Sequence, residues 1–395
     1  MAVAKKIREA MERASWIRRM FEEGARLKQE IGAEKVFDFS LGNPCLDPPA
    51  AYLEALREEL ENPRPGRYAY MPNAGYMETR ASVASCLREK RGTTVEARHI
   101  VMTCGAAGGL NVVLKTLLDP GDEVMVLSPF FPEYLFYVDN HGGVSRIVES
   151  ERDFSLPLGG IEEAISPKTK AVLVNSPNNP TGRMYGEQSL LRLGELLEEF
   201  GRRLDRDIYL ISDEPYGEIV FDGRELPNLF SCYRNTILVN SYSKSLSIAG
   251  DRLGYVAVHP EAQDPETLVD GMVFCNRTLG FVNAPATPQR ILGRTRGLHV
   301  AASEYEERRD LLCRGLQEAG YRFTKPQGAF YLFPESPAPD EIPFVRELMK
   351  EGVLVVPGTG FGRSGYFRIA FCVDKKIIEN ALPAFERVLR RYLSY

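Results

Sequence analysis

The stretch Thr236-Ile-Leu-Val-Asn-Ser241-Tyr-Ser-Lys244 decides the fold, because an apolar run ends there in hydroxyl groups and a lysine. A short, nearly all-apolar run predicts a strand that is covered on both faces, as in a parallel sheet. Two other runs end in polar groups, Tyr209-Leu-Ile-Ser-Asp213-Glu-Pro-Tyr216 and Val172-Leu-Val-Asn-Ser-Pro-Asn-Asn179. Ligands of open α/β sheets bind at the carboxyl ends of strands. We therefore expect a lysine, an acid, a phenol and an amide to converge at one edge.

Between about residues 81 and 258 the chain alternates apolar runs with helical patterns, which is typical of an α/β protein with a mostly parallel sheet. The predicted strands are 99–103, 123–127, 171–175, 208–212, 236–240 and 254–258, and helix candidates include 109–118, 189–202 and 302–318. The last hundred residues suggest an α+β module with its own small sheet. A chain of 395 residues predicts two domains: a large domain over 49–289 and a small domain built from 1–48 and 290–395.

The composition is that of an ordinary globular protein, with 44% hydrophobic and 26% charged residues. The net charge of -5 does not indicate binding to nucleic acid or to an anionic membrane, both of which attract basic proteins. No apolar run is long enough to cross a bilayer, and residues 1–16 lack the apolar region of a secretory signal. We expect a soluble, cytoplasmic protein. The seven cysteines contain no C-x-x-C pair and the four histidines are scattered, so neither a disulfide framework nor a metal site is expected.

The groups at the predicted sheet edge suit one kind of cofactor. A lysine whose pKa is lowered by a dry site or a nearby cation can form an imine. A carboxylate that faces a pyridine nitrogen keeps the ring protonated, so that the ring can accept electrons from a carbanion. An amide and a phenol can hold the phenolic oxygen of the same ring. These are the requirements of pyridoxal phosphate.

The motif Ser241-Tyr-Ser-Lys244, followed by Arg252-Leu-Gly254, resembles the cofactor-lysine signature of the class I/II, fold type I aminotransferases. The resemblance to this aspartate and aromatic aminotransferase group runs nearly end to end, from Leu41-Gly-Asn-Pro44 to a C-terminal arginine. It implies a large domain with a seven-stranded type of sheet covered by helices, and pyridoxal 5'-phosphate as cofactor. It further implies a ping-pong transamination in which Lys244 carries the cofactor as a Schiff base and later moves the α-proton.

The same resemblance implies roles for other residues around the cofactor. Asp213 would pair with the pyridine nitrogen, while Asn179 and Tyr216 would bond to the ring oxygen. Phe131 occupies the place of the aromatic ring that stacks on the cofactor. The phosphate would be held by a strand–glycine–helix turn and by side chains near the lysine: Gly105, Ala106, Ala107, Ser241, Ser243 and Arg252. The turn at Gly105 is by itself equally compatible with simple packing.

Two further residues match the substrate side of the family pattern. Arg368 corresponds to the arginine that grips the substrate α-carboxylate, for which a planar bidentate donor is suited. Gly42 lies in a loop that resembles the one covering the same carboxylate, and Asn179 would also face the substrate. Tyr70 resembles a tyrosine that reaches the neighbouring subunit's phosphate, which would make the protein a homodimer with shared sites. Local packing explains Tyr70 equally well.

The identity of the substrate stays open at this stage. An aspartate- or aromatic-type donor with 2-oxoglutarate as acceptor is expected from the family. Trp16 and Phe21 would suit an apolar side chain, whereas Arg18 or Arg19 would suit an acidic one. The alternatives to a transaminase are a carbon–sulfur lyase on the same fold and a non-enzymatic, aminotransferase-like ligand sensor.

Overall fold

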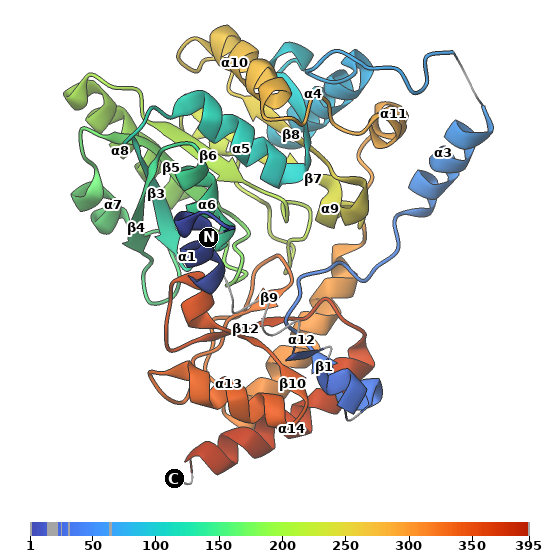
Figure 1. The fold of residues 1–395 in the computed structure, drawn as a ribbon, viewed down its shortest axis with the longest axis vertical. Helices are drawn as coiled ribbons and strands as arrows, with labels where there is room; N and C mark the ends of the chain where they lie inside the picture. Colours follow the sequence, from blue (N-terminus) through green and yellow to red (C-terminus); the bar gives the residue numbers. More distant parts are fainter. Residues whose placement is uncertain (1, 14–22, 25, 31, 63–64, 394–395) are drawn as a thin grey trace.

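The computed structural model describes residues 2–13, 23–24, 26–30, 32–62 and 65–393 (Figure 1). A seven-stranded sheet in the order β2-β8-β7-β6-β5-β3-β4 forms its centre. β8 is antiparallel to both of its neighbours, and the other strands are parallel to one another. The strands are β2 Ile100–Cys104, β3 Glu123–Ser128, β4 Val144–Glu149, β5 Thr169–Asn175, β6 Tyr209–Asp213, β7 Thr236–Ser241 and β8 Leu253–Val258. The predicted α/β fold with a mostly parallel sheet is confirmed.

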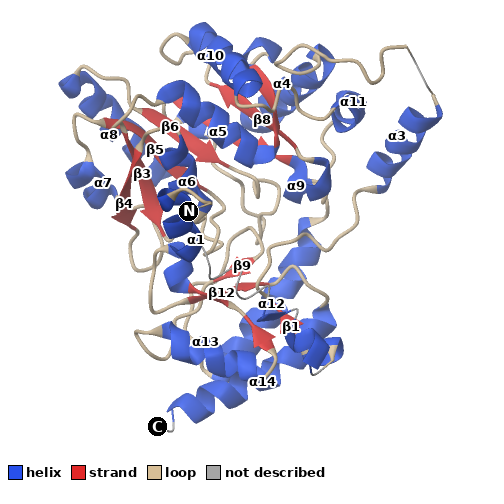
Figure 2. Ribbon diagram, viewed as in Figure 1, coloured by secondary structure: helices blue, strands red, loops and turns tan. Residues whose placement is uncertain are grey.

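Helices cover both faces of this sheet, as Figure 2 shows, and this explains why its strands are apolar on both sides. On one face pack α5 Gly105–Leu117, α6 Glu133–Asn140 and α10 Pro265–Thr278. On the other pack α4 Met77–Arg91, α7 Leu158–Ala164 and α8 Glu187–Leu204, while α11 Ala286–Arg294 packs against α4 and α3 Ala50–Glu61 packs against α11. The short helix α9 Tyr242–Ser245 follows β7 directly.

The C-terminal part builds a second core with small sheets of its own. An antiparallel sheet has the order β11-β12-β9, and the N-terminal β1 pairs in parallel with β10. Its elements are β1 Phe37–Asp38, α12 Ala302–Ala319, β9 Tyr331–Leu332, α13 Glu341–Lys350, β10 Val353–Leu354, β11 Val356–Pro357, β12 Phe367–Ala370 and α14 Lys375–Leu393. N- and C-terminal segments therefore share one core. The domain boundaries at 48/49 and 289/290 stay a prediction.

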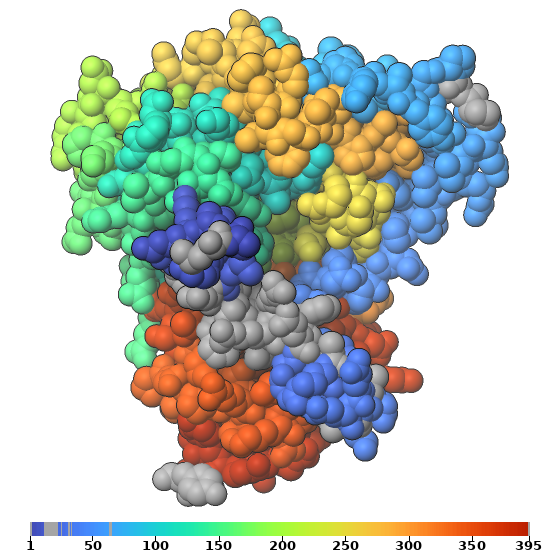
Figure 3. Space-filling model, in the orientation of Figure 1, coloured from blue at the N-terminus to red at the C-terminus, as the bar shows by residue number. Residues whose placement is uncertain are grey.

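The N-terminal helix α1 Lys5–Arg13 lies on the surface of the molecule, where Figure 3 shows it in dark blue over the green elements. Lys6 Nζ forms an ion pair of 2.7 Å with Asp139 of α6, so the helix is attached beside the segment that carries Phe131. Trp16, Arg18, Arg19 and Phe21 lie outside the described residues. In the described part of the chain no helix is long and apolar enough to cross a membrane. The cytoplasmic location stays a prediction from the sequence.

Candidate active site

Lys244 lies on α9, immediately after the carboxyl end of β7, and its side chain is partly buried. Its Nζ donates a hydrogen bond of 2.7 Å to the carbonyl oxygen of Gly42 and lies 5.5 Å from the centre of the Phe330 ring. Burial lowers the pKa of Lys244 to about 8; Cys372 acts in the opposite direction, and the charges of Arg368 and Arg252 lower it further. This amine therefore becomes nucleophilic at a much lower pH than a solvated lysine.

Asp213 ends β6, the strand next to β7, and is buried. The Tyr134 hydroxyl donates a hydrogen bond of 2.5 Å to Asp213 Oδ2, whereas Oδ1 is buried without a partner among the described residues. Burial raises the pKa of Asp213 to about 7; the Tyr134 bond lowers it, and the charge of Glu214 raises it. A buried acceptor without a donor is costly unless a ligand supplies one. A protonated ring nitrogen is such a donor.

Two asparagines connect β5 and its following loop to this edge. Asn175 Nδ2 donates to the carbonyl oxygen of Asp213 at 2.9 Å, and its Oδ1 accepts from the backbone N–H of Asn179 at 2.7 Å. Asn179 Oδ1 in turn accepts from Arg368 Nη1 at 3.0 Å. The loop is thus fixed between the large sheet and β12. This places the Asn179 amide between the acid and the arginine.

Arg368 of β12 is 3% exposed and is held by both parts of the molecule. Besides Asn179, it donates through Nη2 to the carbonyl oxygen of Ser40 at 2.6 Å. Its guanidinium carbon lies 4.7 Å from the centre of the Tyr331 ring and 4.6 Å from that of Phe361. Arg368 Nε is buried without a partner among the described residues. A guanidinium fixed in this way is prepared to bind a planar carboxylate.

The predicted Tyr216 is buried, and its hydroxyl hydrogen-bonds with that of Tyr331 at 2.8 Å. Burial raises the pKa of Tyr216 well above its ordinary value, so the phenol keeps its proton and can donate it in a hydrogen bond. Tyr331 also determines why residue 42 is a glycine. A Cβ on Gly42 would lie 1.9 Å from the Tyr331 hydroxyl oxygen. The Gly42 loop therefore packs directly on the site.

At the other end of the site, α5 begins at Gly105, and no side chain caps its first turn. Gly105 has a positive φ of 69°, and a Cβ there would lie 3.0 Å from Arg252 Nη2. Ala106 and Ala107 contribute the next backbone N–H groups, while Ser241 and Ser243 are buried at the end of β7 and on α9. Free N–H groups at a helix start beside a guanidinium favour a phosphate.

Phe131 and Tyr70 occupy contrasting places. Phe131 is half-buried and contacts Tyr134 edge to face, with the ring centres 5.5 Å apart. It therefore lies beside the tyrosine that donates a hydrogen bond to Asp213. Tyr70 is 91% exposed. That exposure does not fit local packing.

Several residues that contact the predicted groups were not indicated by the sequence: Ser40, Tyr134, Phe330, Tyr331 and Phe361. Tyr134 lies three positions after Phe131, and Phe330 and Tyr331 belong to an aromatic run, Phe330-Tyr-Leu-Phe333. These were the available signals. Neither specifies which group the aromatic side chain contacts.

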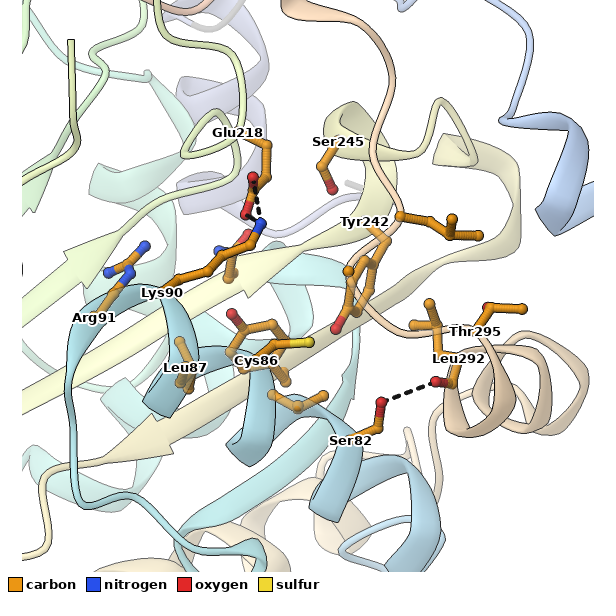
Figure 4. Close-up of a pocket in the computed structure, with 15 residues that line it drawn as sticks. Ser82, Cys86, Leu87, Lys90, Arg91, Glu218, Tyr242, Ser245, Leu292 and Thr295 are labelled. Atoms are coloured by element: carbon orange, nitrogen blue, oxygen red, sulfur yellow. Dashed lines mark hydrogen bonds and ion pairs between the residues drawn. The ribbon is translucent and has the colours of Figure 1, made fainter.

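A separate hollow lies between α4, α9 and the end of α11, and Figure 4 shows the residues that line it. Tyr242 and Ser245 of α9 face this hollow, but Lys244 does not line it. On its wall Lys90 forms an ion pair with Glu218, with both oxygens at 2.7 Å. Asp213 and Arg368 are absent from its lining as well, so the hollow is distinct from the site of the reactive groups.

The sequence matches the family described as aminotransferase class I and II over residues 34–385. The chain belongs to this family. It is 34% identical to the aspartate/prephenate aminotransferase of Thermus thermophilus, over 89% of this chain and 90% of that protein. It is 31% identical to aromatic-amino-acid aminotransferase 2 of Thermococcus litoralis, over 91% of this chain and 93% of that protein.

Solved structures of aminotransferases agree with this assignment. An amino transferase from Eubacterium rectale has a TM-score of 0.96 and 37% identity, covering 99% of both chains. The Thermus thermophilus aspartate aminotransferase with maleate has a TM-score of 0.85 and 30% identity, covering 98% of this chain and 100% of that one. This class I and II aminotransferase is therefore a pyridoxal-phosphate-dependent transaminase of fold type I, as predicted. Nothing in these comparisons favours the carbon–sulfur lyase.

Proposed function

We propose that Lys244, Asp213 and Arg368 form the catalytic centre of this aminotransferase, with Lys244 attached to pyridoxal phosphate. The observation that carries the proposal is a complementary pair at neighbouring strand ends: a partly buried amine with a lowered pKa and a buried carboxylate oxygen, Asp213 Oδ1, that has no donor among the described residues. When bound, the cofactor supplies an electron sink for the negative charge that develops on the substrate α-carbon.

The chain's own residues hold the cofactor in this proposal. Asp213 Oδ1 would accept a hydrogen bond from the protonated ring nitrogen, and Tyr134 orients the same carboxylate by donating to its other oxygen. Asn179 and Tyr216 would donate hydrogen bonds to the ring oxygen, and Phe131 would pack against the ring. Phosphate-binding groups come from the start of α5 and from around Lys244: Gly105, Ala106, Ala107, Ser241, Ser243 and Arg252.

The remaining groups act on the substrate. Arg368 binds its α-carboxylate, and the Gly42 loop closes over the same place and excludes water. Once the substrate amine has replaced it on the cofactor, Lys244 Nζ would take the proton from the substrate α-carbon as a general base, for which an amine with a lowered pKa is suited. Its hydrogen bond to the Gly42 carbonyl oxygen keeps the amine directed toward the substrate side. Amino transfer then proceeds in two half-reactions, from an L-amino acid and to a 2-oxo acid.

The donor is proposed to be of the aspartate or aromatic type, because relatives with these names cover most of the chain. The proposed acceptor is 2-oxoglutarate, which is the first 2-oxo acid to test. We also propose a homodimer in which Tyr70 contributes to the neighbouring subunit's phosphate site. In support, Tyr70 and Tyr68 are 91% and 85% exposed in the single chain, an unusual place for two large aromatic rings unless another surface covers them.

Borohydride tests the lysine assignment, because it makes the bond between the cofactor and its lysine permanent. We expect peptide mapping of the treated protein to find the cofactor on Lys244, and Lys244→Ala to retain none. Lys170→Ala is the matched control, since Lys170 is another half-buried lysine whose pKa is lowered by burial, and it should label normally. Cofactor attached to any other lysine would refute the proposal.

A further inference from the structure

Glu133 is an acidic residue beside the substrate site for which the mechanism above has no use. It is the first residue of α6, two positions after Phe131 and one before Tyr134. The neighbouring Tyr134 reaches Asp213. The segment that carries Glu133 therefore runs along the edge of the site.

The Glu133 carboxyl group is poorly satisfied within the chain. Its Oε2 is buried and has no hydrogen-bond partner among the residues that the structure describes. Burial raises the pKa of Glu133, while its own backbone N–H and the charge of Arg368 lower it. The charge of Arg368 thus acts on this carboxyl group, although the Arg368 guanidinium donates its hydrogen bonds to Asn179 and Ser40.

The charge of Glu133 also acts on two tyrosines near the site. Burial raises the pKa of Tyr331 to about 12, and the charge of Glu133 acts in the same direction. Burial likewise raises the pKa of Tyr137, and Glu133 adds to that shift. Tyr331 packs on Arg368, and Tyr137 lies on α6. The charge of Glu133 therefore acts both on Tyr137 of its own helix and on Tyr331, the residue that packs on the carboxylate-binding arginine.

A purely structural role explains only part of this arrangement. An acidic residue in the first turn of a helix is favoured by the helix dipole. That effect does not require burial, and an exposed carboxylate at the same position would gain it without losing hydration. A buried oxygen without a donor costs free energy that a bound ligand can recover.

We propose that Glu133 selects the substrate side chain: it accepts a hydrogen bond from an N–H or O–H donor and repels a second carboxylate. The inference rests on the proposed transamination at Lys244. Like charges brought together in a partly dry site oppose binding strongly. Of the two donor types proposed above, Glu133 disfavours the aspartate type, and it makes 2-oxoglutarate a poorer acceptor than a neutral 2-oxo acid.

Isosteric substrate pairs test this directly on the cofactor-loaded enzyme. We expect wild-type kcat/KM to be higher for glutamine than for glutamate and for asparagine than for aspartate. Glu133→Gln should shift both ratios toward the dicarboxylate by about tenfold or more. Glu133→Asp keeps the charge and should keep the wild-type preference. Glu163→Gln removes a charge from exposed α7 and should leave the ratios unchanged.

A binding measurement separates this inference from the proposed function. Maleate is a dicarboxylate, and its binding is measured from the rise in melting temperature of the holoenzyme. Glu133→Gln should bind maleate about tenfold more tightly than wild type. Unchanged maleate affinity and unchanged substrate ratios in a well-folded Glu133→Gln protein overturn the inference, even if transamination is confirmed. If no amino acid is transaminated, the proposed function fails, and maleate affinity still decides the role of Glu133.

Discussion

If Lys244 carries the cofactor, as proposed, its burial determines the pH at which the chain can take up pyridoxal phosphate. The pKa of this amine falls from 10.5 to about 8, so the neutral, nucleophilic form becomes the major one as the pH rises above about 8. We predict that the rate of cofactor uptake by the apoprotein increases through about pH 8 and levels off above it. Stopped-flow absorbance over a pH series measures this rate. A midpoint close to 10.5 would show that the amine is solvated.

Single residues also show what the sequence could predict. Lys244, Asp213 and Asn179 were predicted because each follows an apolar strand, and strand ends meet at one sheet edge. Their assigned roles stay predictions. The Tyr134 bond to Asp213 could not be foreseen, because it joins residues 79 positions apart and no local pattern fixes the direction of a phenol. The same holds for Phe361, whose ring reaches Arg368 only after β11 and β12 pair.

The loop that leads from β1 toward α3 acts on the site through close backbone approach. We predict that Gly42→Ala lowers kcat/KM by about 100-fold, as a misplacement near 1 Å at a reacting site can do. The added methyl group would displace Tyr331, whose hydroxyl bonds to Tyr216 and whose ring lies on Arg368. Steady-state kinetics with saturating cofactor measures the loss, which should include a higher KM.

Gly159→Ala provides the control for this substitution, because a Cβ on Gly159 in α7 meets no atom within 4 Å. It should leave kcat/KM and melting temperature near the wild-type values. Wild-type kinetics in Gly42→Ala would show that the loop can move away from Tyr331 without cost, and that it does not position the substrate groups.

At the level of elements, apolar runs predicted strand positions well but not strand direction. The runs 99–103 and 254–258 correspond to β2 and β8, yet nothing in them indicates that β8 is antiparallel to its neighbours. The helix expected at 109–118 begins four residues earlier, at Gly105. Glycine-rich sequence has low helix propensity, and tertiary packing of α5 against β7 and β8 overrides it. The helix start therefore coincides with the proposed phosphate site.

Large apolar side chains are exposed on the surface of the molecule around Tyr70, the residue proposed to reach the neighbouring subunit's phosphate site. Tyr68, Tyr70 and Met77 follow one another along the chain, and all three are more than half exposed. A second copy that covers them would explain their exposure, because large apolar patches on a surface commonly mark interfaces. In that assembly, Tyr70 of each chain would complete the site of the other chain.

Mixed dimers provide the decisive test of shared sites. We predict that Lys244→Ala and Tyr70→Ala proteins, each nearly inactive alone, regain about a quarter of wild-type activity when unfolded together and refolded at equal amounts. Half of the dimers would then be hybrids, and each hybrid would have one site with an intact Lys244 and an intact Tyr70. Light scattering should give the mass of two chains for every sample. If Tyr70 served its own chain, no hybrid site would be complete, and activity would stay at the level of the separate variants.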